Sequence, residues 1–209
     1  MEIEFKGANC VVISTKKATI VVDGKLSDVG LKDVLPKGSI YLATQPDFVL
    51  QPDEGLMIDR PGEYEVSNIS VKGVSTKRMI DHDDASRGTI YRVRAGGVTI
   101  AVVGHSAIPL SEEQLEAIGV VDVAVVPVGG NGYTADGHQA VGLVRQLDPK
   151  VVIPTHYADK AVKYEVPQMD LEAFTKELSA PAQEKLPKWK VKNGALPDVV
   201  TLIELERTA

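Results

Sequence analysis

The segment Val151-Val152-Ile153-Pro154-Thr155-His156-Tyr157 constrains the fold of this chain more than any other. It joins a short β-branched apolar run to a proline and a histidine. A run of this kind is typical of a buried strand, and its carboxyl end is where layered α/β proteins place metal ligands and catalytic groups. The segment therefore predicts a buried strand with His156 at a functional edge.

The two halves of the chain differ in pattern. The first half is a series of short β-branched runs separated by turn residues, and the second half alternates apolar runs with amphipathic helical patterns. This order suits two sheets packed face to face with helices outside, in one domain covering residues 1–209. The expected strands are 1–6, 10–14, 19–22, 40–43, 56–58, 64–66, 69–74, 89–93, 98–103, 121–126, 151–153 and 199–205. The expected helices are 111–118, 136–147 and 170–178.

Composition excludes several classes of protein. A formal net charge of −6 disfavours contact with a phosphate backbone, so no nucleic-acid partner is expected. No apolar run approaches the roughly 20 residues that span a bilayer, and the first residues lack the pattern of a signal peptide. Cys10 is the single cysteine, so no internal disulfide can form. Together these features favour a cytoplasmic protein without a membrane partner.

Five motifs, in this order and spacing, carry a family resemblance: Gly7-Ala8-Asn9-Cys10, the strand 19–23 that ends in Asp23, the segment 60–66 with Pro-Gly-Glu-Tyr-Glu, the segment 121–130 with Pro-x-Gly-Gly, and the segment 149–157. The chain resembles the metallo-β-lactamase-fold hydrolases, in particular a small bacterial branch that includes ascorbate-lactonase-like proteins. The resemblance implies a four-layer αβ/βα sandwich of the α/β class. It also implies a di-metal site that activates water for hydrolysis.

The metal ligands of the family are only partly matched. The opening motif Thr-His-x-His-x-Asp-His falls on Thr44-Gln45-Pro46-Asp47-Phe48-Val49-Leu50. Valine and leucine cannot bind a metal, and glutamine is a poor zinc ligand, so only Asp47 can serve there. The resemblance places the bridging aspartate on His105 and retains the last histidine as His156. The middle histidine is replaced near Lys77 and Arg78, with His82 a few residues further on.

Two hypotheses follow. The first is a protein that has lost the usual di-zinc site, has no cofactor, and binds an unidentified small molecule or protein. Its pocket would include Gly129, Gly130 and Asn131, because backbone N–H groups of such a loop can cradle an anion. The alternative is a hydrolase of the lactone or phosphodiester class with one zinc or other divalent ion. Its ligands would be His105, His156 and either Asp47 or His82.

Both hypotheses share one geometric expectation. Asp23, Asp47, His105 and His156 each follow an expected strand, so we expect them to gather at one edge of the sandwich. No individual catalytic residue can be assigned from the sequence. The resemblance also implies self-association into a homo-oligomer.

Overall fold

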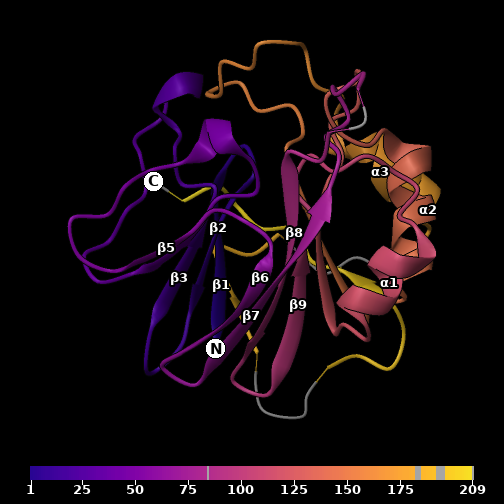
Figure 1. Cartoon of the computed structure of the whole chain (residues 1–209). Coiled ribbons are helices and arrows are strands. Elements are labelled where there is room, and N and C mark those ends of the chain that lie inside the picture. Colours follow the sequence, from indigo (N-terminus) through magenta and orange to yellow (C-terminus); the bar gives the residue numbers. More distant parts are fainter. Residues whose placement is uncertain (84, 182–184, 192–195, 209) are drawn as a thin grey trace.

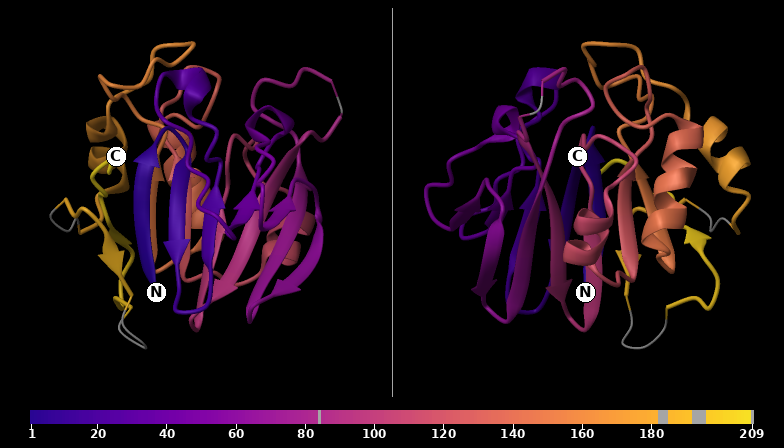
Figure 2. Two further views of the ribbon diagram at one scale, coloured as in Figure 1. Left: turned by 90° about the vertical axis from the view of Figure 1, so that its left-hand side faces the viewer. Right: turned by 45° about the vertical axis from the view of Figure 1, so that its right-hand side comes forward.

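Two mixed β-sheets packed face to face form the body of the protein in this computed structural model, which describes residues 1–83, 85–181, 185–191 and 196–208 (Figures 1 and 2). The six-stranded sheet has the order β12-β1-β2-β3-β4-β5, and the seven-stranded sheet has the order β13-β11-β10-β9-β8-β7-β6. The strands of the first sheet are β1 Glu2–Gly7, β2 Cys10–Ser14, β3 Thr19–Val22, β4 Ile40–Leu42, β5 Leu56–Ile58 and β12 Trp189–Lys190. Those of the second are β6 Gly62–Val66, β7 Ile69–Thr76, β8 Gly88–Ala95, β9 Val98–Val102, β10 Val123–Pro127, β11 Val151–Thr155 and β13 Thr201–Leu202.

The main apolar core lies between the sheets. In β1, residues alternate between half-buried and buried, so Ile3 and Phe5 point into the core while the intervening residues do not. All five residues of β10 and all five of β11 are buried, as expected for parallel strands covered on both faces. Burial of this apolar surface is the main contribution to stability.

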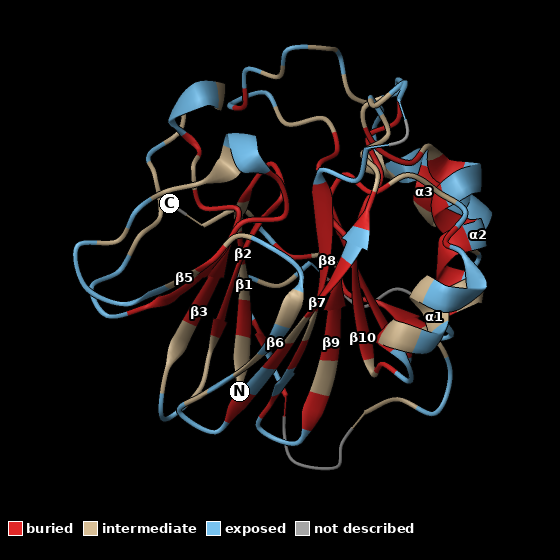
Figure 3. Ribbon diagram, in the orientation of Figure 1, coloured by how far each residue is buried: buried red, intermediate tan, exposed pale blue. Residues whose placement is uncertain are grey.

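Three α-helices in the described part of the chain lie on the outer side of the seven-stranded sheet (Figure 1). They are α1 Glu112–Ile118, α2 Gly137–Leu147 and α3 Leu171–Leu178. Helix α1 contacts β7, α2 contacts β10 and α3 packs on α2. Ser111 and Asp136 begin the first two with capping boxes, in which the side chain accepts a hydrogen bond from the backbone three residues on. The buried side chains of α2 face β10, and its exposed face is turned to solvent (Figure 3).

The outer face of the six-stranded sheet is covered differently. A second apolar cluster on this face includes Cys10, Val21 and Tyr41, and it packs under the loop segments 26–35 and 49–50. The described stretches 26–35 and 46–50 contain two short 3-10 turns, η1 Ser27–Val29 and η2 Pro46–Phe48, and no α-helix. The predicted αβ/βα sandwich is confirmed, with loops and 3-10 turns forming the layer over this sheet.

Most predicted elements are confirmed within a few residues. The predicted strand 199–205 is shorter, since only Thr201 and Leu202 pair with β11. The two-residue strand β12 was not predicted, because two residues carry no detectable periodicity. Across the described ranges, no helix is both long and apolar enough to cross a bilayer.

Strand direction determines where a site can form. In one sheet β3 and β4 are parallel, and in the other β9, β10 and β11 are parallel. Their carboxyl ends therefore lie at one edge of the sandwich, where loops from both sheets meet. The residues that follow these strands include Asp23, Thr44, His105 and His156.

Candidate functional site

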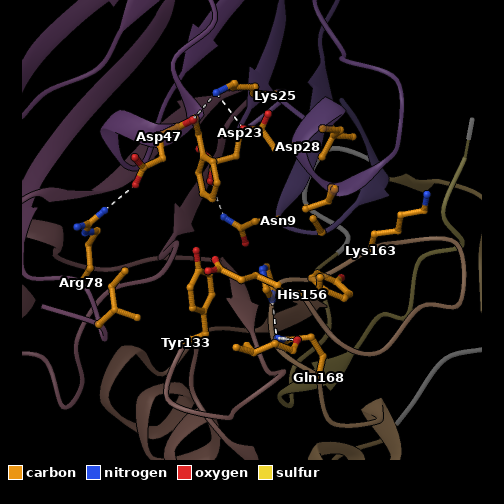
Figure 4. Close-up of a pocket in the computed structure, with 18 residues that line it drawn as sticks. Asn9, Asp23, Lys25, Asp28, Asp47, Arg78, Tyr133, His156, Lys163 and Gln168 are labelled. Atoms are coloured by element: carbon orange, nitrogen blue, oxygen red, sulfur yellow. Dashed lines mark hydrogen bonds and ion pairs between the residues drawn. The ribbon is translucent and has the colours of Figure 1, made fainter.

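A cavity of about 860 Å³ lies at this edge (Figure 4). This volume is within the range of small-molecule sites in proteins. Its walls combine charged, aromatic and amide side chains, so it is suited to a ligand with both polar and apolar parts. The lining residues with functional side chains are Asn9, Asp23, Lys25, Asp28, Asp47, Phe48, Arg78, Tyr133, His156, Lys163, Tyr164, Glu165 and Gln168.

A buried polar network supports the deep end of the cavity. Asp23 is 2% exposed, and its carboxylate accepts hydrogen bonds from Asn9 Nδ2 at 2.6 Å, Thr44 N at 2.7 Å and Thr44 Oγ1 at 2.6 Å. Asn9 Oδ1 in turn accepts from Thr155 Oγ1 at 2.9 Å. Desolvation outweighs these hydrogen bonds and raises the pKa of Asp23 to about 6. The network ties β2, β3, β4 and β11 together at the site.

His156 ends β11 in a left-handed backbone conformation, with φ of 53°. Its N–H donates to the carbonyl of Ala8 at 2.7 Å, and its Nδ1 lies 3.1 Å from Gln168 Oε1. The ring stacks at a tilt on Tyr164, with centroids 4.7 Å apart. Burial lowers the pKa of His156 to about 4, so the imidazole is neutral at physiological pH.

His105 lies beneath the cavity wall. It follows Gly104, whose positive φ and close approach to Thr44 leave no room for a Cβ. The imidazole packs between Phe48, Tyr133 and His156, with ring centroids 5.2, 5.2 and 4.6 Å away. Both ring nitrogens are buried without a hydrogen-bond partner. Desolvation, with smaller contributions from His156 and Arg78, lowers the pKa of His105 well below its ordinary value.

Arg78 connects the loop after β7 to the rim of the cavity. Asp81, whose side chain is 4% exposed, binds the Arg78 guanidinium through Nε at 3.2 Å and Nη2 at 2.9 Å. The remaining nitrogen, Nη1, lies 2.7 Å from Asp47 Oδ2. The hydrogen bonds with Asp81 hold the pKa of that carboxyl below its usual range. A fixed positive charge therefore stands beside the site.

The structure brings together most of the predicted site residues. Asp23, Asp47 and His156 line the cavity, and His105 packs against His156 directly behind the wall. The predicted proximity of the two histidines is therefore confirmed. His82 is exposed and is not among the residues that line the cavity.

The glycine-rich loop after β10 forms hydrogen bonds with other segments of the protein. Gly129 O accepts from the Met169 N–H at 2.8 Å, and Gly130 N–H donates to the Ala135 carbonyl at 3.0 Å. The Asn131 side-chain amide donates to the Pro167 carbonyl. None of the three is a lining residue of the cavity, and the loop instead supports the neighbouring segment 167–169, which carries Gln168.

The donor set does not fit the di-zinc centre of the family. Among the residues that the structure describes, no three His, Cys, Asp or Glu side chains are grouped so that they could hold a metal ion. Val49 and Leu50 pack on the apolar cluster of the outer sheet face, and the Asp47 carboxylate is paired with Arg78. The guanidinium also adds a like charge where a metal cation would have to bind.

Several lining residues were not predicted from the sequence. Lys25, Lys163, Tyr164 and Gln168 come from irregular segments that carry no periodic pattern. Two of them contact the predicted residue His156: Gln168 through a hydrogen bond, and Tyr164 by packing on the imidazole ring. The segment 156–170 could have been suspected only from its position directly after the His156 strand.

Comparison with known proteins identifies the family. The profile of the beta-lactamase superfamily domain matches residues 2–156, which is most of the chain. The chain belongs to the beta-lactamase superfamily. A UPF0173 protein of Pyrococcus furiosus is 29% identical over 154 residues, which cover 74% of this chain and 64% of that protein. The chain thus spans less than two thirds of this relative.

A UPF0173 protein of Pyrococcus abyssi is 24% identical over 189 residues, covering 75% of this chain and 83% of that protein. Both relatives are archaeal, so the expected assignment to a bacterial branch stays a prediction.

Solved structures agree on the fold. A metallo-β-lactamase superfamily protein of Thermotoga maritima superposes with a TM-score of 0.75 and 24% identity, covering 98% of this chain and 99% of that one. Igni18, a metallo hydrolase of Ignicoccus hospitalis, gives a TM-score of 0.61 and 17% identity, covering 97% and 94%. At these identities the likeness establishes the architecture alone.

Proposed function

We propose that this chain is a superfamily member that has lost the usual di-zinc site and uses the retained cavity to bind a ligand without catalysing hydrolysis. The observation that carries the proposal is the Arg78–Asp47 pair at 2.7 Å. The one carboxylate of the opening motif that could bind a metal is neutralised by a protein cation. Asp81, whose side chain is 4% exposed, holds that cation in place.

The remaining donors support the same reading. His105 and His156 are neutral imidazoles, and two imidazoles fall short of the three protein ligands that a catalytic zinc site uses. Asp23 is enclosed by hydrogen bonds from Asn9 and Thr44, so its carboxylate is already used in holding the fold. The cavity still has a concave shape, hydrogen-bonding groups and an aromatic surface, which are the features that bind a small molecule.

A second candidate rests on a different observation. Both ring nitrogens of His105 lack a partner, and its ring centroid is 4.6 Å from that of His156. Buried polar atoms without partners are costly, and a bound ion would satisfy one of them. With Asp47 released from Arg78, a single divalent ion could have three ligands, and hydrolysis of a lactone or phosphodiester would then be the function.

Thermal unfolding with and without a strong chelator tests the proposal. A ligand at a thousand times its Kd stabilises a protein by about 4 kcal/mol, which for a chain of this size shifts Tm by roughly 10 °C. We expect the chelator, and separately added zinc, to change Tm by less than about 1 °C. A large fall in Tm on chelation, reversed by zinc, would instead favour the mononuclear hydrolase.

A further inference from the structure

One edge of the Arg78 guanidinium is fixed, and the other is presented to the cavity. Asp81 binds Nε and Nη2 and also accepts from the Arg78 backbone N–H at 3.1 Å. The Arg78 side chain is 15% exposed and lines the cavity (Figure 4). Because Asp81 orients the fork, Nη1 is a prepared donor for an anionic group.

The carboxylate now on Nη1 is easily displaced. The Asp47 side chain is 65% exposed, and ion pairs with an exposed partner contribute little to stability. Asp47 lies on the short 3-10 turn η2, so its carboxylate can turn to solvent without disturbing a strand. A ligand carboxylate or phosphate could therefore take its place on Arg78 while the contact with Asp81 remains.

Two lysines add positive charge around the same cavity. Lys25 Nζ pairs with the Asp28 carboxylate at 2.9 Å, and that side chain is 62% exposed, so this pair too is readily exchanged. Lys163 is exposed at the other side of the cavity in Figure 4. The three cations alternate around the cavity with four carboxylates, those of Asp23, Asp28, Asp47 and Glu165. A ligand anion is therefore expected at an individual cation whose partner can be displaced, and Arg78 is the one held in a fixed orientation.

The wall between the cations is aromatic. Phe48, Tyr133, His156 and Tyr164 line the cavity, with Tyr133 and His156 stacked at 6.0 Å between ring centroids. Such surfaces favour stacking with a flat ring.

We infer that the ligand is a small organic anion, in which a flat ring is joined to a carboxylate or phosphate group. The ring stacks on the aromatic wall, and the anionic group binds Arg78 in place of the Asp47 carboxylate. Asp47 thus acts as an internal competitor for the ligand. This inference rests on the proposed function, since it requires a cavity free of a di-metal centre.

Calorimetric titration at low salt with four probes tests the ligand class. Phenyl phosphate and benzoate each carry a ring and an anion, inorganic phosphate lacks the ring, and benzyl alcohol lacks the charge. We expect at least one ring-bearing anion to bind about tenfold more tightly than either partial probe. The preference between phenyl phosphate and benzoate then distinguishes a phosphate ester from a carboxylate as the natural ligand.

The Asp47→Asn variant gives the sharpest result, because the account predicts a gain. Removing a negative charge about 4 Å from the ligand anion is worth about 1 kcal/mol in water, or about fivefold tighter binding. Asp53→Asn removes an exposed carboxylate outside the cavity and should leave the affinity unchanged. If Asp47→Asn weakens binding or leaves it unchanged, the competitor role is wrong.

Lys163→Ala should weaken binding of the ring-bearing anion severalfold at unchanged Tm, whereas Lys160→Ala, outside this cavity, should not. Arg78→Ala is less informative, since it leaves the shielded Asp81 carboxylate without its main partner.

Elemental analysis of the same preparation distinguishes a failure of the proposed function from a failure of the ligand class. Stoichiometric zinc contradicts the proposed function, while metal-free protein that binds neither ring-bearing anion contradicts the ligand class alone.

Discussion

Two buried residues at the site respond to pH in opposite directions. The pKa of His156 is lowered to about 4 by burial, so between about pH 6.5 and 4 the unfolded chain binds a proton that the folded chain does not. Protonation of His156 in the unfolded chain therefore lowers the free energy of unfolding as the pH falls. The pKa of Asp23 is raised from 3.8 to about 6, so between these values the folded chain binds the extra proton. Protonation of Asp23 in the folded chain therefore raises the free energy of unfolding as the pH falls.

These opposed effects give a prediction for Asp23→Asn. Because His105 acts in the same sense as His156, we expect the free energy of unfolding of the native chain to decrease from pH 7 to pH 5. Without Asp23 the decrease should be steeper, by up to about 1.4 kcal/mol per pH unit below pH 6. Urea denaturation at several pH values measures both slopes. Equal slopes would mean that Asp23 does not hold a raised pKa.

At this scale the sequence predicted the residues that follow strands and missed those in loops. Asp23, Asp47, His105 and His156 could be placed because a strand end fixes the position of the next residue. Lys163 and Gln168 reach the cavity from an irregular segment that is held by backbone hydrogen bonds from Lys163 to Val29 and from Met169 to Gly129. No local pattern encodes that course.

Among the elements, the junction of β10 and β11 is the most sterically constrained part of the site. A Cβ on Gly129 would overlap the His156 carbonyl and the Gln168 side chain. The two strand ends can therefore approach closely only because residue 129 has no side chain. The Gly-Gly motif, which was expected to contact a ligand, has this packing role in the structure.

We expect Gly129→Ala to destabilise the fold by about 2 kcal/mol or more, because overpacking forces the backbone apart. Gly142→Ala is the matched control, since that glycine is exposed in α2 with nothing within 4 Å of an added Cβ. The control should gain about 0.5–1 kcal/mol from reduced backbone entropy. Urea unfolding of both variants measures the contrast, and similar free energies for the two would contradict the packing role.

At the scale of the whole molecule, the fold was more predictable than the site. Strand and helix periodicities are local, and together with the motif order they predicted two sheets with outer helices. The proposed loss of metal ligands rests on residues already visible in the sequence, Val49 and Leu50. The pairing of Arg78 with Asp47 could not be predicted, because the two residues are 31 positions apart. Homo-oligomerisation stays a prediction.

The central claim is that the cavity has no zinc centre, and the zinc content of protein purified without added metal tests it most directly. The account predicts far less than one equivalent per chain after dialysis, unchanged in His105→Ala and His156→Ala. One equivalent that survives dialysis in the native chain, and is lost in either variant, would contradict the account and make this protein a mononuclear metal enzyme.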